Sequence, residues 1–255
     1  MESQFLGVPD IDGWIFFGLT VAAFVTAVIG MVTGTGGGLV LLALMAIFFT
    51  PAVLIPMHTV VQLGSGFTRA IQMWSWVLKP LIPPFLIGIV IGAVLGTQIF
   101  FSLSSAALQA VIGGAIITLA WLPKLARAGG ERNRFAVLGF LATFLGVFIS
   151  ATGTMLSPFI ASASPDRRNH AATMAALMGM VHIAKLVAFG VVGVAIGAYA
   201  PLMVAMIMAG MLGNWVGVRA LNRIPERLFR IVFQVLLTVL ALRMLWRAAV
   251  EYGLI

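Results

Sequence analysis

Two basic residues, Arg69 and Lys185, lie deep inside apolar segments of the sequence, whereas no carboxylate does. The seven acidic residues all fall near the termini or in polar breaks: Glu2, Asp10, Asp12, Glu131, Asp166, Glu226 and Glu251. A charge in hydrocarbon costs about 2.5–3.5 kcal/mol even on insertion scales, so such residues usually face a cavity or a substrate path. Buried cations without buried anions therefore predict a binding site for a negatively charged ligand.

The composition indicates that lipid, rather than water, surrounds most of the chain. Of its 255 residues, 62% are hydrophobic and 9% are charged, whereas a soluble domain carries about a quarter charged residues. About eight spans of ~20 apolar residues fit this length. We therefore expect the chain to form a single transmembrane transporter domain over residues 1–255.

The distribution of charge and the absence of cysteine exclude several partners. The net charge of +8 comes from residues near span ends, where membrane orientation and anionic lipid account for it, so we expect no nucleic-acid partner. Without cysteine there are no disulfides and no thiolate metal sites, and we expect no metal and no cofactor. No Lys or Arg precedes the first apolar segment at Trp14, which predicts an outside N-terminus and no cleaved signal peptide.

The apolar segments repeat in order along the chain. They run over residues 14–34, 38–50, 53–78, 80–101, 105–122, 135–151, 155–164, 169–192, 199–218 and 228–250. Two of them, 38–50 and 155–164, are too short to span, and each follows a glycine-containing break and precedes a proline. The chain therefore resembles two copies of one unit, 14–122 and 135–250. This predicts an all-α polytopic membrane protein whose repeats each contain a broken helical hairpin followed by three transmembrane helices.

The basic residues favour an inverted relation between the two repeats. If each break is the tip of a hairpin that enters and leaves on one side, each repeat makes an odd number of crossings. The basic residues then expected inside are Lys79, Lys124, Arg127, Arg132, Arg134, Arg167, Arg168, Arg219, Arg223, Arg227 and Arg230. Only Arg243 and Arg247 fall outside, whereas eight simple spans would divide the basic residues almost evenly. The positive-inside rule thus predicts inverted repeats, an arrangement of secondary transporters with the site near the midplane.

The segment around Arg69 carries a polar face. His58, Gln62, Ser65, Arg69 and Gln72 recur at helical spacing, which places them on one side of a helix that we expect to avoid lipid. The guanidinium of arginine offers a planar fork of donors suited to an oxyanion. We therefore expect this face to contribute to the anion site.

In the second repeat, His182 and Lys185 are three residues apart and share a helix face. At 1.5 Å per residue, Arg69 lies ~15 Å and Lys185 ~25 Å from the inner surface of the membrane. The two cations therefore approach the midplane from opposite sides in the inverted arrangement.

Each candidate also has a purely structural interpretation. The side chain of Arg69 or Lys185 could extend so that its charged group reaches the membrane–water interface. His58 could simply form a hydrogen bond to a neighbouring helix. Met174, Met178 and Met180 are typical of packing. Further glycines are more typical of close helix contacts than of a site, namely Gly88, Gly92 and Gly96.

The two breaks are the second set of candidates. A helix that begins near Gly37 or Gly38 would present free N–H groups and a partial positive charge to an anion. The residues that we expect to line the site from the breaks are Thr35, Gly36, Gly37, Gly38, Thr152, Gly153 and Thr154. The alternative is that the glycines only form a tight hairpin turn.

The Gly-x-Gly-Gly-Gly tip at residues 34–38, the proline at position 51, the threonine at position 59 and a second copy after a basic loop form a known pattern. It resembles the TauE/SafE sulfite exporter family, also called the 4-toluene sulfonate uptake permease family, over nearly the whole chain. The resemblance implies a multi-pass transporter of the bacterial inner membrane for sulfite, organosulfonates or other small organic anions. Here the second break reads Ala151-Thr152-Gly153-Thr154, whereas the family often has a second glycine cluster there.

We expect a secondary transporter that works by alternating access. No P-loop occurs, so ATP does not drive it, and coupling through His58, His182, a protonated substrate or sodium stays open, as does uniport. An anion channel is one alternative. An intramembrane enzyme is another, although neither H-E-x-x-H nor G-x-S-x-G occurs. The tryptophan-bearing surfaces are compatible with a monomer or a homodimer.

Overall fold

The computed structural model of the chain describes residues 4–33, 37–121, 131–150, 152–220 and 226–253. The described part contains α-helices, short 3-10 helices and no strand. The first five helices are α1 (Gly13–Thr33), α2 (Gly37–Met45), α3 (Pro51–Gln72), α4 (Ile82–Ser102) and α5 (Ser105–Trp121). The next five are α6 (Glu131–Ile149), α7 (Gly153–Ala163), α8 (Arg167–Val191), α9 (Ala200–Ala220) and α10 (Glu226–Glu251). The 3-10 helices are η1 (Trp74–Trp76), η2 (Lys79–Leu81) and η3 (Gly197–Tyr199).

These helices confirm the predicted all-α class and the two short helices after the breaks. α2 begins at Gly37 and α7 at Gly153, and both helices are too short to cross the hydrocarbon core of a membrane. Four segments of the described chain are long and apolar enough to cross a membrane: Gly13–Met31, Lys79–Ser102, Arg168–Val191 and Gly197–Gly217. The chain therefore has the features of a multi-pass membrane protein.

Acidic residues mark two of the helix starts. The Asp166 side chain accepts hydrogen bonds from the backbone N–H groups of Arg168 and Asn169 at 2.7 and 2.9 Å. Asp12 accepts from the N–H of Ile15 at 2.8 Å in the same way. Both satisfy backbone donors that the first turn of a helix leaves without intrahelical partners. The acids thus stabilise helix ends outside the apolar segments.

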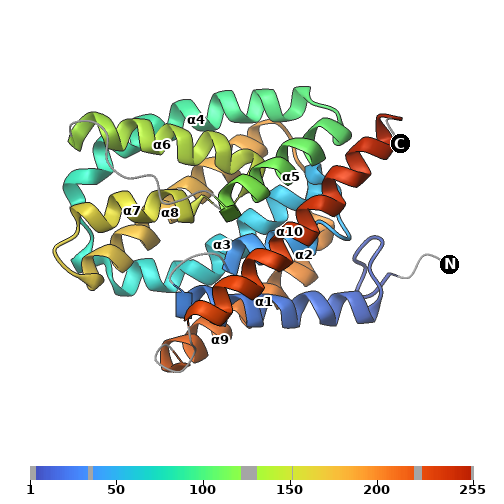
Figure 1. The fold of residues 1–255 in the computed structure, drawn as a ribbon, viewed down its shortest axis with the longest axis horizontal. Helices are drawn as coiled ribbons and strands as arrows, with labels where there is room; N and C mark the ends of the chain where they lie inside the picture. Colours follow the sequence, from blue (N-terminus) through green and yellow to red (C-terminus); the bar gives the residue numbers. More distant parts are fainter. Residues whose placement is uncertain (1–3, 34–36, 122–130, 151, 221–225, 254–255) are drawn as a thin grey trace.

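The long helices pair across the two sets of five. α4 packs along α6, α1 along α9, α5 along α10 and α3 against α8. Figure 1 shows α4 with α6 along one edge of the molecule, α1 with α9 along the opposite edge, and α2, α3 and α8 between them. The fourth helix of each set thus packs on the first helix of the other.

Glycines allow the closest of these contacts. A Cβ at Gly88 of α4 would collide with the carbonyl oxygen of Ala136 on α6, and a Cβ at Gly139 with that of Phe85. A Cβ at Gly217 of α9 would lie 2.6 Å from the Cβ of Met31 on α1. Small residues let backbones approach in membrane proteins, so the predicted packing role of the α4 glycines is confirmed.

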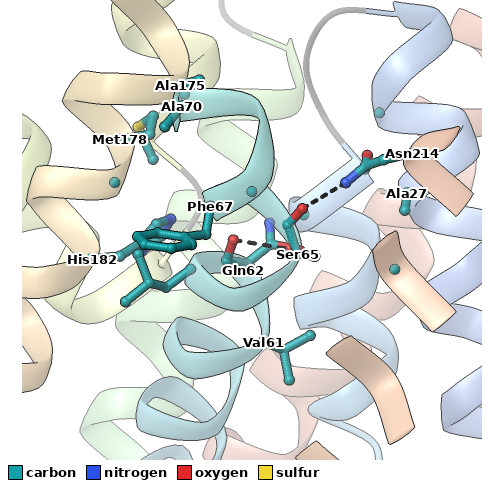
Figure 2. A pocket seen from close by; sticks show the side chains of 18 of the residues that line it. Ala27, Val61, Gln62, Ser65, Phe67, Ala70, Ala175, Met178, His182 and Asn214 are labelled. Carbon is teal, nitrogen blue, oxygen red and sulfur yellow. Dashed lines mark hydrogen bonds between the residues drawn. The ribbon is translucent and has the colours of Figure 1, made fainter. Parts of the chain in front are cut away.

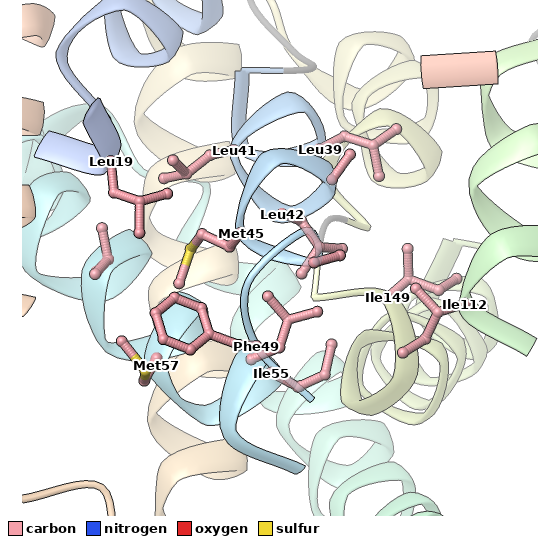
Figure 3. Close-up of a cluster of buried hydrophobic side chains, with 14 of the residues drawn as sticks. Leu19, Leu39, Leu41, Leu42, Met45, Phe49, Ile55, Met57, Ile112 and Ile149 are labelled. Carbon is pink, nitrogen blue, oxygen red and sulfur yellow. The ribbon is translucent and has the colours of Figure 1, made fainter. Parts of the chain in front are cut away.

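The larger buried apolar cluster surrounds α2. Figure 3 shows Leu39, Leu42 and Met45 of this helix among side chains from both halves of the chain, including Met57 and Ile149. Nearly every residue of α2 is buried. The short helix is therefore a core element, and its neighbours fix where its first residue lies.

Candidate functional site

A cavity of about 460 Å³ lies between α1, α3, α8 and α9, beside the starts of α2 and α7. Most of its lining is apolar and includes Phe67, Ile71 and Trp74 of α3 and η1, and Met174 and Met178 of α8. The polar side chains that line it are Thr26, Gln62, Ser65, Ser150, His182 and Asn214. Figure 2 shows Gln62 and Ser65 from α3 and His182 from α8 around this space.

The cavity gathers part of the predicted site. The predicted residues that line it are Gly37, Gly38, Gln62, Ser65, Gly153 and His182. His58, Thr152 and Lys185 are buried behind this lining. Thr35 and Gly36, and the side chains of Arg69 and Thr154, lie outside what the structure describes.

Lys185 is fully buried and begins a chain of hydrogen bonds. Its Nζ donates to Ser150 Oγ at 2.9 Å, and Ser150 Oγ lies 3.1 Å from Thr59 Oγ1. Thr59 Oγ1 donates to the carbonyl oxygen of Ile55 at 2.7 Å, so Ser150 must donate to Thr59 while it accepts from Lys185. With an exposed fraction of 0%, Lys185 does not extend to an interface, and that interpretation is wrong for this residue.

Ser150 adopts an unusual backbone conformation at this point. Its φ is +56°, in the left-handed region that costs a non-glycine residue about 1–3 kcal/mol and that commonly ends a helix, here α6. The side chain is 1% exposed, yet Ser150 lines the cavity. Ser150 therefore connects the buried lysine with the cavity.

Two histidines lie near the lysine. His58 Nε2 is 2.8 Å from the carbonyl oxygen of Gly38, to which its N–H donates, so His58 makes the bond to a neighbouring helix that its structural interpretation supposes. His58 precedes Thr59 in α3, and His182 lies about one helical turn before Lys185 in α8. The Nδ1 atoms of both rings are buried and have no hydrogen-bond partner among the described residues. Since buried polar atoms are rarely unpaired, the Nδ1 of His182 is an unexplained polar atom in a residue that lines the cavity.

The two breaks differ in their freedom to bind a ligand. A Cβ at Gly37 would lie 2.8 Å from Gly30 Cα and would collide with the carbonyl oxygen of Thr26, so this glycine is needed for contact between α1 and α2. The amide of Gln62 covers Gly38. A Cβ at Gly153 would instead make an ordinary contact, 3.5 Å from Met174 Cε.

The polar residues of the site that escaped the sequence-based prediction of site residues are Thr26, Thr59, Ser150 and Asn214. Asn214 Nδ2 donates to the carbonyl oxygen of Ser65 at 3.0 Å, as Figure 2 shows. A signal for Asn214 existed, because it is the only amide in the apolar sequence of α9. Thr59 belongs to the family pattern described above, but its part in the site depends on Ser150, 91 residues away.

No group of three or more His, Cys, Asp or Glu that could hold a metal ion occurs in the described part of the chain. The chemistry of the site is therefore that of hydroxyl, amide, imidazole and ammonium groups. These groups are hydrogen-bond donors around a largely apolar space, and such donors suit an anion.

The family model described as "Sulfite exporter TauE/SafE" matches residues 19–244. The chain belongs to the TauE/SafE family. The match extends from α1 to α10 and so includes both breaks and every wall of the cavity. Comparison with curated proteins and with solved structures found no significant match.

Membership of the TauE/SafE family confirms the resemblance drawn from the glycine pattern. It implies a membrane transporter of sulfur-containing anions, and the apolar helices agree with a multi-pass membrane location. The TauE/SafE assignment and the buried lysine thus point to the same class of ligand.

Proposed function

We propose that the chain is a secondary transporter of small sulfur-containing anions that works by alternating access, with its anion site in the described cavity. The observation that carries this proposal is the cavity between the paired helices, with fully buried Lys185 connected to its wall through Ser150. A buried ammonium without a carboxylate partner is costly, and an anion in the cavity would offset that cost. Saturable uptake of labelled 4-toluenesulfonate or sulfite into proteoliposomes tests the proposal.

The size and lining of the cavity favour an organosulfonate over bare sulfite. Cavities of several hundred Å³ with few polar groups suit ligands that bury an apolar body. Phe67, Trp74 and the methionines Met174 and Met178 would contact such a body. Sulfite has no apolar part and would leave most of the 460 Å³ to water.

We also propose that residues 14–122 and 135–250 are inverted repeats. Two features support this arrangement: the helix order of the two halves agrees, and each first helix packs on the other half's fourth. In Figure 1, the start of α1 and the end of α10 lie at one end of the molecule. The starts of α4 and α8 lie at the opposite end, as the count of basic residues requires.

The cavity lies towards the end of the molecule that the positive-inside rule assigns to the cytoplasm. It is lined by the second halves of α1, α3 and α9 and by the middle of α8. At the other end, Phe49 and Tyr199 meet edge to face, with ring centroids 5.7 Å apart, beside the larger apolar cluster. We therefore propose that the structure represents an inward-facing state.

The inverted arrangement predicts the location of the C-terminus. A reporter fused after Ile255 should appear on the outer side of the bacterial inner membrane, because ten helical elements with two hairpins leave both ends outside. Alkaline phosphatase and green fluorescent protein fusions give opposite signals on the two sides. Fluorescence from the second fusion without phosphatase activity from the first would contradict the inverted arrangement.

Arg69 provides a separate test of the anion site. It lies in α3 between Phe67 and Ala70, both of which line the cavity. We expect Arg69→Ala to lower the initial rate of 4-toluenesulfonate uptake about 100-fold, as loss of a charge-assisted hydrogen bond would. Arg219→Ala is the matched control, because Arg219 is exposed and stacks 3.5 Å from the Trp215 ring centroid. Equal rates for the two variants would remove Arg69 from the site.

A further inference from the structure

We infer that the anionic head group of the substrate binds at the start of α7, against Gly153, Ser150 and His182, and not at the start of α2. The inference rests on the proposed function and assigns the two ends of the cavity different tasks. Both breaks begin short helices, and the sequence alone treats them as equivalent. Both breaks line the cavity, but the start of α2 is packed tightly against α1 and Gln62, whereas the start of α7 has only the ends of methionine side chains beside it.

The first turn of α7 has donors that no side chain satisfies. Thr152 occupies the N-cap position but makes no capping hydrogen bond. Its Oγ1 donates instead to the carbonyl oxygen of Ala142 at 3.0 Å. The backbone N–H groups at the start of a helix bind anions when no cap occupies them, and Gly153 at this position lines the cavity.

His182 is a second, independent indication of a ligand at this end. It is 5% exposed and lines the cavity, and its Nδ1 has no hydrogen-bond partner in the described part of the chain. A buried ring nitrogen without a partner is rarely retained in a protein. Because the ring lines the cavity, rotation of the side chain would turn Nδ1 to the head group, and the protonated nitrogen would then donate to one of its oxygens.

Lys185 supplies positive charge from behind this end of the cavity. Its stem passes Gly146 of α6, where an added Cβ would lie 3.7 Å from Lys185 Cδ. Its Nζ reaches the cavity wall only at Ser150 Oγ among the described hydrogen bonds. Rotation of the Ser150 hydroxyl would move its donated proton from Thr59 to the anion, while Lys185 continues to donate to the same oxygen.

The start of α2 lacks this freedom. Gly37 is packed against the backbone of α1, and the Gln62 side chain covers Gly38. The carbonyl oxygen of Gly38 also accepts from His58 Nε2. Near the start of α7, by contrast, the neighbours of Gly153 are the flexible ends of Met174 and Met178, which would contact the apolar body beside the head group.

The test is a comparison of dissociation constants for detergent-solubilised full-length protein, measured by equilibrium dialysis. The probes are 4-toluenesulfonate, sulfite, benzoate and phenylphosphonate, with the neutral 4-toluenesulfonamide as a control for the apolar body. For each anion that binds the wild-type protein, we expect Ser150→Ala to raise the dissociation constant about 10-fold. Lys185→Met should raise it about 100-fold. These factors are in the range for hydrogen bonds to charged groups. Binding of the sulfonamide should stay the same.

Matched variants separate the two ends of the cavity. Ser102→Ala removes an exposed hydroxyl at the end of α4 and is the control for Ser150→Ala. Gln62→Met removes the side-chain amide that reaches from α3 and covers Gly38 at the start of α2. Anion affinity that falls in Gln62→Met but survives in Ser150→Ala and Lys185→Met would overturn the inference and leave the proposed function standing.

The remaining outcomes separate the inference from the proposed function. If only benzoate or phenylphosphonate binds, and its affinity falls in Ser150→Ala and Lys185→Met, the head-group site is supported. The proposal that the substrate contains sulfur is then wrong. If no anion binds the wild-type protein, both fall. Unchanged affinity in all variants would also overturn the head-group site.

Discussion

Lys185→Met is expected to lower the initial rate of 4-toluenesulfonate uptake into proteoliposomes at least about 100-fold, as loss of a hydrogen bond to a charged group would. The lysine is fully buried, and its Nζ donates to Ser150 at the cavity wall. Methionine has a similar length and no charge, so it fills the same volume without attracting an anion. The protein should still insert, because a buried charge is removed rather than added.

The control for this variant is Lys79→Met. Lys79 is exposed in η2 and lies outside the cavity lining. We expect its uptake rate to stay within about 2-fold of the wild type, since surface charges contribute little. Normal uptake by Lys185→Met would show that the buried lysine serves only the fold.

Gly37→Ala is expected to damage the fold rather than to weaken substrate binding selectively. The added methyl group would collide with the Thr26 carbonyl oxygen and lie 2.8 Å from Gly30. Backbone atoms of α1 cannot rotate away as a side chain can. Overpacking of this kind typically costs about 1–3 kcal/mol, so we expect the melting temperature in detergent to fall by roughly 4–10 °C.

Gly153→Ala is the matched variant, because Gly153 begins α7 as Gly37 begins α2. Its methyl group would lie 3.5 Å from Met174 Cε, an ordinary contact with a flexible side chain. We expect its melting temperature to stay within about 2 °C of the wild type, the effect of a small change in stability. Equal losses in the two variants would contradict the difference between the breaks.

The order and type of the helices could be predicted from the sequence. The lengths of the apolar segments and the breaks before them indicated α2 and α7, and the spacing of Gly88 and Gly92 indicated a close helix contact. These features are local, since they depend on residues within one helix or one turn. For the same reason the polar face of α3 was found, and Gln62 and Ser65 do line the cavity.

The connections between distant segments could not be predicted. Ser150 bonds Lys185, 35 residues away, and Thr59, 91 residues away. How tightly each break is packed also depends on neighbours, because Gln62 reaches Gly38 whereas methionine ends flank Gly153. Such contacts are set by how α3 and α8 pack, and no periodicity in either segment records that packing.

A carrier exposes its binding site to one side of the membrane at a time. An open channel connects both sides at once. This distinction decides the choice between the proposed function and the anion-channel alternative. In alternating access, unlabelled substrate inside a vesicle speeds entry of labelled substrate, because the loaded site returns faster to the outside. In a channel, unlabelled substrate inside has no such effect when the membrane potential is held at zero.

The most direct test of the central claim is therefore a counterflow measurement. Proteoliposomes preloaded with unlabelled 4-toluenesulfonate are diluted into a trace of the labelled anion, with equal potassium on both sides and valinomycin to hold the membrane potential at zero. We predict a transient accumulation of label above its equilibrium level, which is absent from protein-free liposomes and from Lys185→Met proteoliposomes. Entry of label at the same rate with and without preloading, and without saturation, would contradict a carrier.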